Sequence, residues 1–154
     1  TVLSVDLAYT DVRAIGVVAL TGAGAGPLSV TVHDVPGAGA PAVDGLAAWL
    51  DDTAGQCRAR VLCLDGPSAW KSPASELAHA RRSERVLHTP GKTGCAPDGV
   101  KPRGYLGFTR FSIALFEALI ARGWRLPHDA AARAAPRTVC ETFPTAACRR
   151  LGLP

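Results

Sequence analysis

The order of its apolar segments constrains the fold of this chain more than any other feature. Three strand-like runs, at residues 1–8, 14–20 and 28–35, precede the first helical pattern and are joined only by short polar or Gly-rich connections. Strands connected in this way pair as an antiparallel meander. A helical pattern at 42–54 and a fourth apolar run at 60–65 follow. A strand–helix–strand passage predicts a right-handed crossover into a parallel strand.

The second half of the chain has weaker signals at its start and stronger ones at its end. We expect a helix over 72–87 and a long loop over 88–107, where Pro, Gly and Lys accumulate. An amphipathic helix is predicted over 109–123, a fifth strand over 137–144, and a short helix over 144–152.

This order predicts an α/β fold with one five-stranded mixed sheet. The predicted strand order is 3-2-1-4-5, with strand 2 antiparallel and helices on both faces of the sheet. The chain has 154 residues, 47% of them hydrophobic and 19% charged. A chain of that size and composition supports one folded core, so we expect residues 1–154 to form a single domain.

The five cysteines are scattered and include no C-x-x-C pair, which argues against a structural zinc site. Cys63 and Cys140 lie inside apolar strand-like runs, so we expect them to be small core residues. Unpaired cysteines of this kind predict a reducing, cytoplasmic environment.

The sequence contains no sign of a membrane partner. No uninterrupted apolar run approaches the roughly 18 residues that span a bilayer. The first residues also lack the pattern of a signal peptide. We therefore expect a soluble protein.

Positive charge is concentrated in the middle of the chain. The formal net charge is +4, and residues 71–110 carry eight Lys or Arg against three acids. Such an excess favours a polyanionic partner such as nucleic acid. The alternative is a solvated basic surface with no partner.

Three acids stand at the ends of predicted strands: Asp6, Asp65 and Glu141. If strands 4 and 5 lie parallel beside strand 1, these carboxylates reach the same edge of the sheet, where open sheets place their sites. Carboxylates gathered there repel one another unless a cation neutralises them, and Mg²⁺ or Mn²⁺ prefers such oxygen ligands. Such ions support phosphodiester hydrolysis. The alternative is that each acid is only a turn residue, as Asp65 before Gly66-Pro67 would be.

Four motifs resemble one known family. They are "VDLA" in the first strand, "LDGP" in the fourth, "RRSER" after it, and "ETFPTAACRRLG" near the end. In this order they resemble the family called domain of unknown function 429, whose members are predicted nucleases of ribonuclease H-like fold. The resemblance implies that fold here and implies that Asp6, Asp65 and Glu141 are the acidic site residues. It also implies that Arg81 or Arg82, with Glu84, matches the family's Arg-x-x-acid element.

The resemblance has one departure. The family usually continues into a further helix that carries another acidic residue, whereas this sequence ends at Pro154. We therefore expect either a domain truncated at its C terminus or a member that lacks this ligand.

Together these patterns predict a metal-dependent nuclease. Asp6, Asp65 and Glu141 would bind Mg²⁺ or Mn²⁺ and carry the catalysis. The residues predicted to bind the substrate are Arg81, Arg82, Glu84, Arg85 and Lys92. Two alternatives stay open: a non-catalytic module of the same fold that binds nucleic acid or protein, and an enzyme acting on a small phosphorylated substrate.

Two nucleotide-binding motifs are excluded. Gly91-Lys92-Thr93 has the ending of a P-loop, but Val86 stands where that motif needs glycine, and no strand leads into it. The glycines near residue 24 lead into a strand instead of a helix, which excludes a dinucleotide fingerprint.

Overall fold

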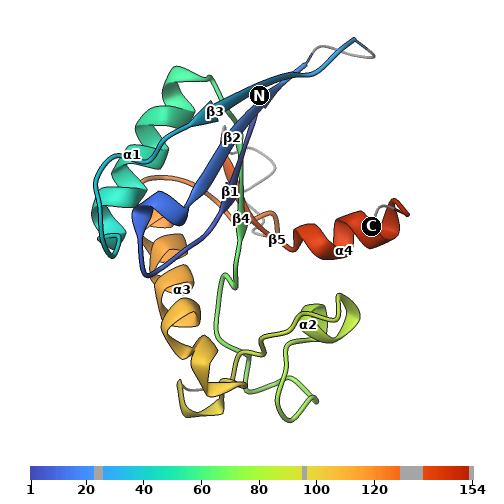
Figure 1. Cartoon of the computed structure of the whole chain (residues 1–154). Helices are drawn as coiled ribbons and strands as arrows, with labels where there is room; N and C mark the ends of the chain where they lie inside the picture. The colour runs from blue at the N-terminus through green and yellow to red at the C-terminus, as the bar shows by residue number, and fades with distance from the viewer. Residues whose placement is uncertain (23–25, 95–96, 129–136, 153–154) are drawn as a thin grey trace.

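One mixed sheet organises the protein. The computed structural model describes residues 1–22, 26–94, 97–128 and 137–152. The strands are β1 (Val2–Asp6), β2 (Gly16–Thr21), β3 (Ser29–His33), β4 (Val61–Asp65) and β5 (Thr138–Thr142). Their order is β3-β2-β1-β4-β5, with β2 antiparallel to its neighbours and β4 and β5 parallel to β1. The predicted α/β class, the strand order and the antiparallel second strand are confirmed (Figure 1).

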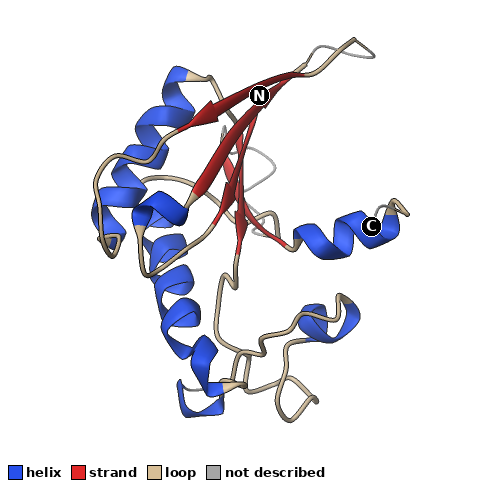
Figure 2. Cartoon of the chain, in the orientation of Figure 1, coloured by secondary structure: helices blue, strands red, loops and turns tan. Residues whose placement is uncertain are grey.

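Two long helices cover one face of this sheet. They are α1 (Val43–Gln56) and α3 (Leu106–Ala121), and they pack against each other as well as against the strands (Figure 2). The core lies beneath them. Its fully buried members include Leu3, Leu62, Leu64, Leu50 and Phe116.

The opposite face was expected to carry helices too, and this expectation was wrong for the described residues. The remaining helices are short: α2 (Arg82–Val86) and α4 (Pro144–Arg150). Within α4 no residue is buried, and the chain turns away from the sheet there (Figure 1). Strands β1 and β4 show the same asymmetry, because alternate residues are fully buried while those between them are not (buried: Leu3, Val5, Leu62 and Leu64). Side chains alternate across a strand, so one face can be buried while the other meets water.

The two strand cysteines lie on this open face. Cys63 and Cys140 alternate with the buried residues Leu62, Leu64 and Val139, and both are only half-buried. Their interpretation as core residues was therefore wrong. An apolar run in a sheet with one open face places only every second residue in the core.

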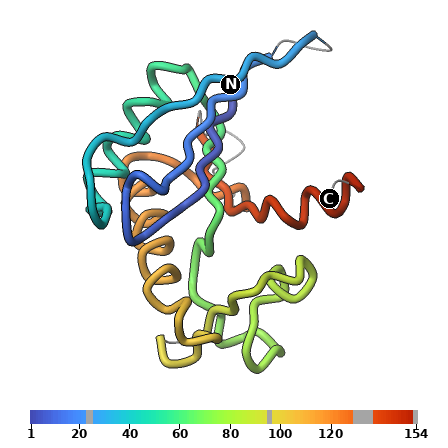
Figure 3. The backbone as a smooth tube through the Cα atoms, in the orientation of Figure 1, coloured from blue at the N-terminus to red at the C-terminus, as the bar shows by residue number. Residues whose placement is uncertain are grey.

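A long excursion, described at residues 66–94 and 97–105, connects β4 to α3 and forms a lobe beyond the carboxyl edge of the sheet (Figure 3). The helix predicted over 72–87 is reduced to α2, and two single 3₁₀ turns, Pro97–Gly99 and Arg103–Tyr105, follow it. The predicted helix has few apolar side chains to bury, and short helices without such packing are marginal in water. The predicted loop ends early, because α3 begins at Leu106.

One helical stretch, Arg103–Ala121, is long and apolar enough by length and composition to cross a membrane. Seven residues of α3 are buried in the protein, among them Phe111, Leu115 and Leu119. The apolar character of this helix is thus explained by its packing on the sheet.

Candidate functional site

Two carboxylates lie side by side at the carboxyl edge of the sheet. Asp6 ends β1 and Asp65 ends β4, and the two residues are direct partners in the parallel register. Asp6 is exposed and Asp65 is half-buried. Within the described ranges, neither side chain has a hydrogen-bond or ion-pair partner. Neighbouring strands are about 4.8 Å apart, so this pair concentrates uncompensated negative charge.

The turn after Asp65 is held closely against α3. A Cβ atom at Gly66 would lie 2.4 Å from the Oγ of Ser112 and 3.2 Å from the ring of Phe108. The Ser112 hydroxyl donates a hydrogen bond of 2.9 Å to the carbonyl of Pro67. Gly66 is therefore required by a close approach, and the contact with α3 fixes the direction in which the chain leaves Asp65.

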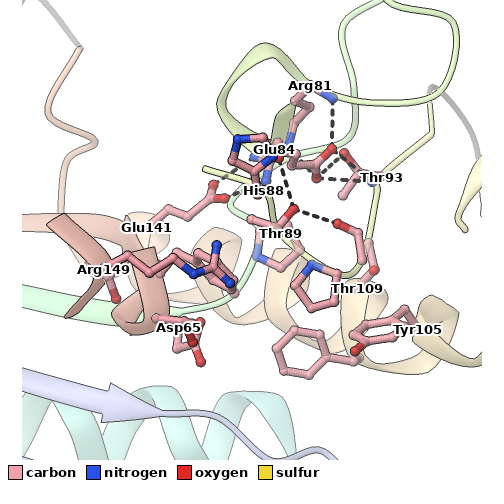
Figure 4. A pocket seen from close by; sticks show the side chains of 18 residues that line it. Asp65, Arg81, Glu84, His88, Thr89, Thr93, Tyr105, Thr109, Glu141 and Arg149 are labelled. Atoms are coloured by element: carbon pink, nitrogen blue, oxygen red, sulfur yellow. Dashed lines mark hydrogen bonds and ion pairs between the residues drawn. The ribbon is translucent and has the colours of Figure 1, made fainter. Parts of the chain in front are cut away.

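Glu141 stands apart from that pair. It aligns with Leu64, one residue before the Asp65–Thr142 pair, so the pleat directs its side chain to the other face. Its carboxylate accepts hydrogen bonds from Arg81 Nη1 at 2.7 Å and Arg81 Nη2 at 2.5 Å. The backbone N–H and the hydroxyl of Ser68 add two more at 3.0 Å. Figure 4 shows Glu141 directed towards Arg81 and away from Asp65.

Arg81 joins Glu141 to a second, buried carboxylate. The Arg81 backbone N–H and Nε donate to Glu84 at 2.8 and 3.0 Å. The backbone N–H and hydroxyl of Thr93 also donate to Glu84, which is 3% exposed. We call Glu141, Arg81, Glu84 and Thr93 the arginine network. It links β5 to both ends of the segment 81–93, so its members anchor the lobe to the sheet.

Asp65 and the arginine network line one pocket of about 450 Å³, whereas Asp6 is not among its lining residues. Asp65, Arg81, Glu84 and Glu141 line it, together with side chains that the sequence did not point to. Tyr105 and Phe108 form an aromatic wall, and Arg149 reaches the pocket from α4 (Figure 4). Arg149 belongs to the quoted "CRRLG" motif, which was the only signal that could have found it.

The other predicted substrate-binding residues lie elsewhere. Arg82 and Arg85 are exposed and line an adjoining groove with Trp70, and Arg81 and His88 line both that groove and the pocket. Lys92 lies outside both hollows, and its ammonium donates to the carbonyl and hydroxyl of Thr89.

The electrostatics distinguish the two clusters. Burial raises the pKa of Asp65, and the negative charges of Asp6 and Glu141 raise it further. Arg81 is partly buried, which lowers its pKa, but hydrogen bonds and charge from Glu141 and Glu84 outweigh burial and raise it overall. The Arg81 guanidinium is thus held permanently charged inside the arginine network. The negative charge of Asp65, by contrast, is disfavoured by burial and by the neighbouring acids.

The donors fit a hard cation only in part. Asp6 and Asp65 are adjacent carboxylates without a partner among the described residues, and carboxylates are ligands that Mg²⁺ and Mn²⁺ prefer. Glu141 is fully engaged by Arg81 and Ser68. Across the described residues no group of three His, Cys, Asp or Glu is arranged to hold a metal. The geometry therefore fits a site with two protein carboxylates and not the predicted site with three.

No protein-family model, curated protein or solved structure matches this chain. The functional argument therefore depends on the chemistry of the site itself. The relationship to domain of unknown function 429 stays a prediction.

Proposed function

We propose that this protein is a ribonuclease H-like domain of the domain of unknown function 429 type, and that it hydrolyses phosphodiester bonds in nucleic acid with Mg²⁺ or Mn²⁺. One observation carries the proposal: Asp6 and Asp65 are in register at the carboxyl ends of adjacent parallel strands and have no counter-charge among the described residues. Sites in open sheets lie at this edge.

Asp6 and Asp65 are the residues that would hold the cation. When bound, a divalent cation can activate a water molecule and stabilise a leaving phosphate oxygen. The chain supplies the surroundings. Arg149 offers positive charge at the pocket for a phosphate group, and the rings of Tyr105 and Phe108 exclude water from one wall.

The proposal gives Glu141 and Arg81 a supporting role. Three nitrogen atoms of the Arg81 side chain are committed to Glu141 and Glu84, which leaves the guanidinium little capacity to hold a phosphate. Glu141 in turn holds Arg81 and Ser68 in place. We therefore assign the cation to Asp6 and Asp65, and the orientation of the lobe to the arginine network.

Arg82 and Arg85 are assigned to the path of a longer substrate. They are exposed on the groove that adjoins the pocket, and Trp70 lines the same groove. Exposed arginines beside an aromatic ring suit the phosphates and bases of a single strand. Binding along this groove would bring the nucleic acid past Asp65.

The direct test is a calorimetric titration with Mg²⁺ and Mn²⁺, paired with cleavage of labelled single-stranded and duplex DNA and RNA. We expect binding and cleavage in the wild type, and loss of both in Asp6→Asn and Asp65→Asn. The matched control is Asp52→Asn, since Asp52 is an exposed aspartate on α1, outside the pocket. Equal cation binding in the wild type and both site variants would refute the proposal.

Two outcomes would support the alternatives. Salt-sensitive oligonucleotide binding that survives Asp65→Asn, without cleavage by the wild type, would indicate a binding module that uses Arg82 and Arg85. A rise in melting temperature with mononucleotides and none with oligonucleotides would indicate a small phosphorylated substrate.

A further inference from the structure

A pair of thiols lies on the open face of the sheet. Cys63 and Cys140 are direct partners across β4 and β5, and their sulfur atoms are 3.5 Å apart. The two residues are 77 positions apart in the sequence. Only the folded sheet brings them together.

Their surroundings leave this pair accessible. Both cysteines are half-buried, and the long helices α1 and α3 lie on the opposite face. Cys140 also lines a hollow of about 350 Å³ beside Leu126 and His128. A small polar oxidant can therefore reach at least one of the two sulfur atoms.

The pair also has the chemistry of a reactive dithiol. The two sulfur atoms are within hydrogen-bond distance of each other, and either one can be the donor. A thiolate is the nucleophilic form of cysteine. Because Cys140 lines the hollow that admits an oxidant, we assign Cys140 as the attacking group and Cys63 as the resolving group.

The backbone spacing permits a covalent bond. Paired residues on neighbouring strands have Cα atoms about 4.8 Å apart, within the range of about 4.4–6.8 Å that disulfides span. Closure needs the sulfur atoms to approach from 3.5 Å to about 2.05 Å. Rotation of two half-exposed side chains supplies most of this movement.

We propose that Cys63 and Cys140 form a reversible dithiol site that a peroxide converts into a disulfide between β4 and β5. The Cys140 thiolate attacks a peroxide oxygen: an S–O bond forms, the O–O bond breaks, and hydroxide leaves and is protonated. The Cys63 sulfur then attacks the Cys140 sulfenic acid, so that an S–S bond forms, the S–O bond breaks and water leaves. Two thiols and one hydrogen peroxide thus yield one disulfide and two waters.

This site is independent of the proposed nuclease activity. It adjoins that site along the chain, because Asp65 lies two residues after Cys63 and Glu141 directly follows Cys140. The Cys63–Cys140 bond would tie together the two strands that carry those acids.

The test treats the full chain with one equivalent of hydrogen peroxide and maps the peptides by mass spectrometry without reduction. We expect a Cys63–Cys140 cross-linked peptide that dithiothreitol reverses. Cys140 should be consumed by peroxide faster than Cys57, because it lines a hollow and the neighbouring Cys63 sulfur resolves its sulfenic acid. In Cys63→Ser, a sulfenic acid at Cys140 should be trapped by dimedone.

Cys57→Ser is the matched control, since Cys57 is also half-buried but has His33 as its sulfur partner. It should leave formation of the cross-link unchanged. Free Cys63 and Cys140 in the wild type after the other thiols have been consumed would overturn the proposal. A cross-link from either residue to a different cysteine would do the same, and neither result depends on a variant that folds.

Discussion

Asp65, Glu84 and Glu141 line one pocket, but the surroundings of Asp65 are the opposite of those of the two glutamates. Glu84 and Glu141 accept eight hydrogen bonds from Arg81, Thr93 and Ser68. One of these donors, the Thr93 N–H, is shared between both oxygens of Glu84. Asp6 and Asp65 have no such partner in the described chain.

The contrast separates a structural use of charge from a functional one. Buried carboxylates with full hydrogen bonding hold elements in place, and here they hold the lobe to β5. Carboxylates left adjacent without a counter-charge reduce stability, and such an arrangement is typical of sites that bind a ligand. Substitutions in each group of carboxylates test this division.

Glu84→Gln should cause the largest loss. The substitution leaves the Arg81 guanidinium partly buried with one carboxylate fewer and disturbs the bonds from Thr93. Breaking a buried pair in this way costs about 3 kcal/mol of unfolding free energy. Urea denaturation measures it, and Glu76→Gln, an exposed glutamate in the same lobe, should change stability by less than about 0.5 kcal/mol. Equal losses of stability in the two variants would refute the structural role assigned to the arginine network.

Glu141→Gln should have a smaller effect on stability and none on cation affinity. Glu141 is 27% exposed as a side chain, so water screens its pair with Arg81 and the expected loss is about 1–2 kcal/mol. Titration with Mg²⁺ in the same variant sharpens the comparison. A loss of cation binding would indicate that Glu141 is a metal ligand, as the sequence predicted.

In the absence of a bound metal ion, Asp65→Asn should stabilise the protein. Removing the negative charge relieves burial and repulsion from Asp6, so the melting temperature should rise by about 1–3 °C at neutral pH. Calorimetry in EDTA measures the change. A fall in melting temperature would show that Asp65 has a stabilising partner. It would refute the distinction between Asp6–Asp65 and the arginine network.

The same variant carries a pH signature. The pKa of Asp65 is raised above its ordinary value of 3.8 in the folded protein, so folding favours the protonated form. The resulting stabilisation is fully present below the unfolded pKa and is lost as pH rises through the folded pKa. The advantage of Asp65→Asn over the wild type should therefore shrink as pH falls from 7 to 4. An advantage independent of pH would contradict the assignment.

Much of the fold could be predicted because its signals are local. The runs that became β1, β2, β3, β4 and β5 are visible as apolar or alternating segments, and the connection lengths imply their order. The helix predicted over 72–87 was wrong because the structure of this segment depends on contacts with distant residues. Its helical propensity is not supported by a face to bury, and Arg81 and Glu84 are fixed by contacts with Glu141 and Thr93.

About half of the candidate site could be predicted from the sequence. Asp6 and Asp65 end their strands, so strand order alone makes them neighbours. Glu141 is one residue short of that register, and a shift by one residue reverses the face of a strand. Arg149, Tyr105 and Phe108 have no local signal that ties them to Asp65, because they reach the pocket from other elements.

The sequence by itself determined the order of strands and helices, the apolar face that carries the core, and the two aspartates at adjacent strand ends. These depend on periodicity and connection length, which act over a few residues. The tertiary structure decided that Arg81 binds Glu141, that Glu84 is buried, and that Cys63 meets Cys140 on an open face. These pairings join residues 60 and 77 positions apart or depend on what covers a surface. These contacts contribute to the free energy of folding only once the sheet has formed.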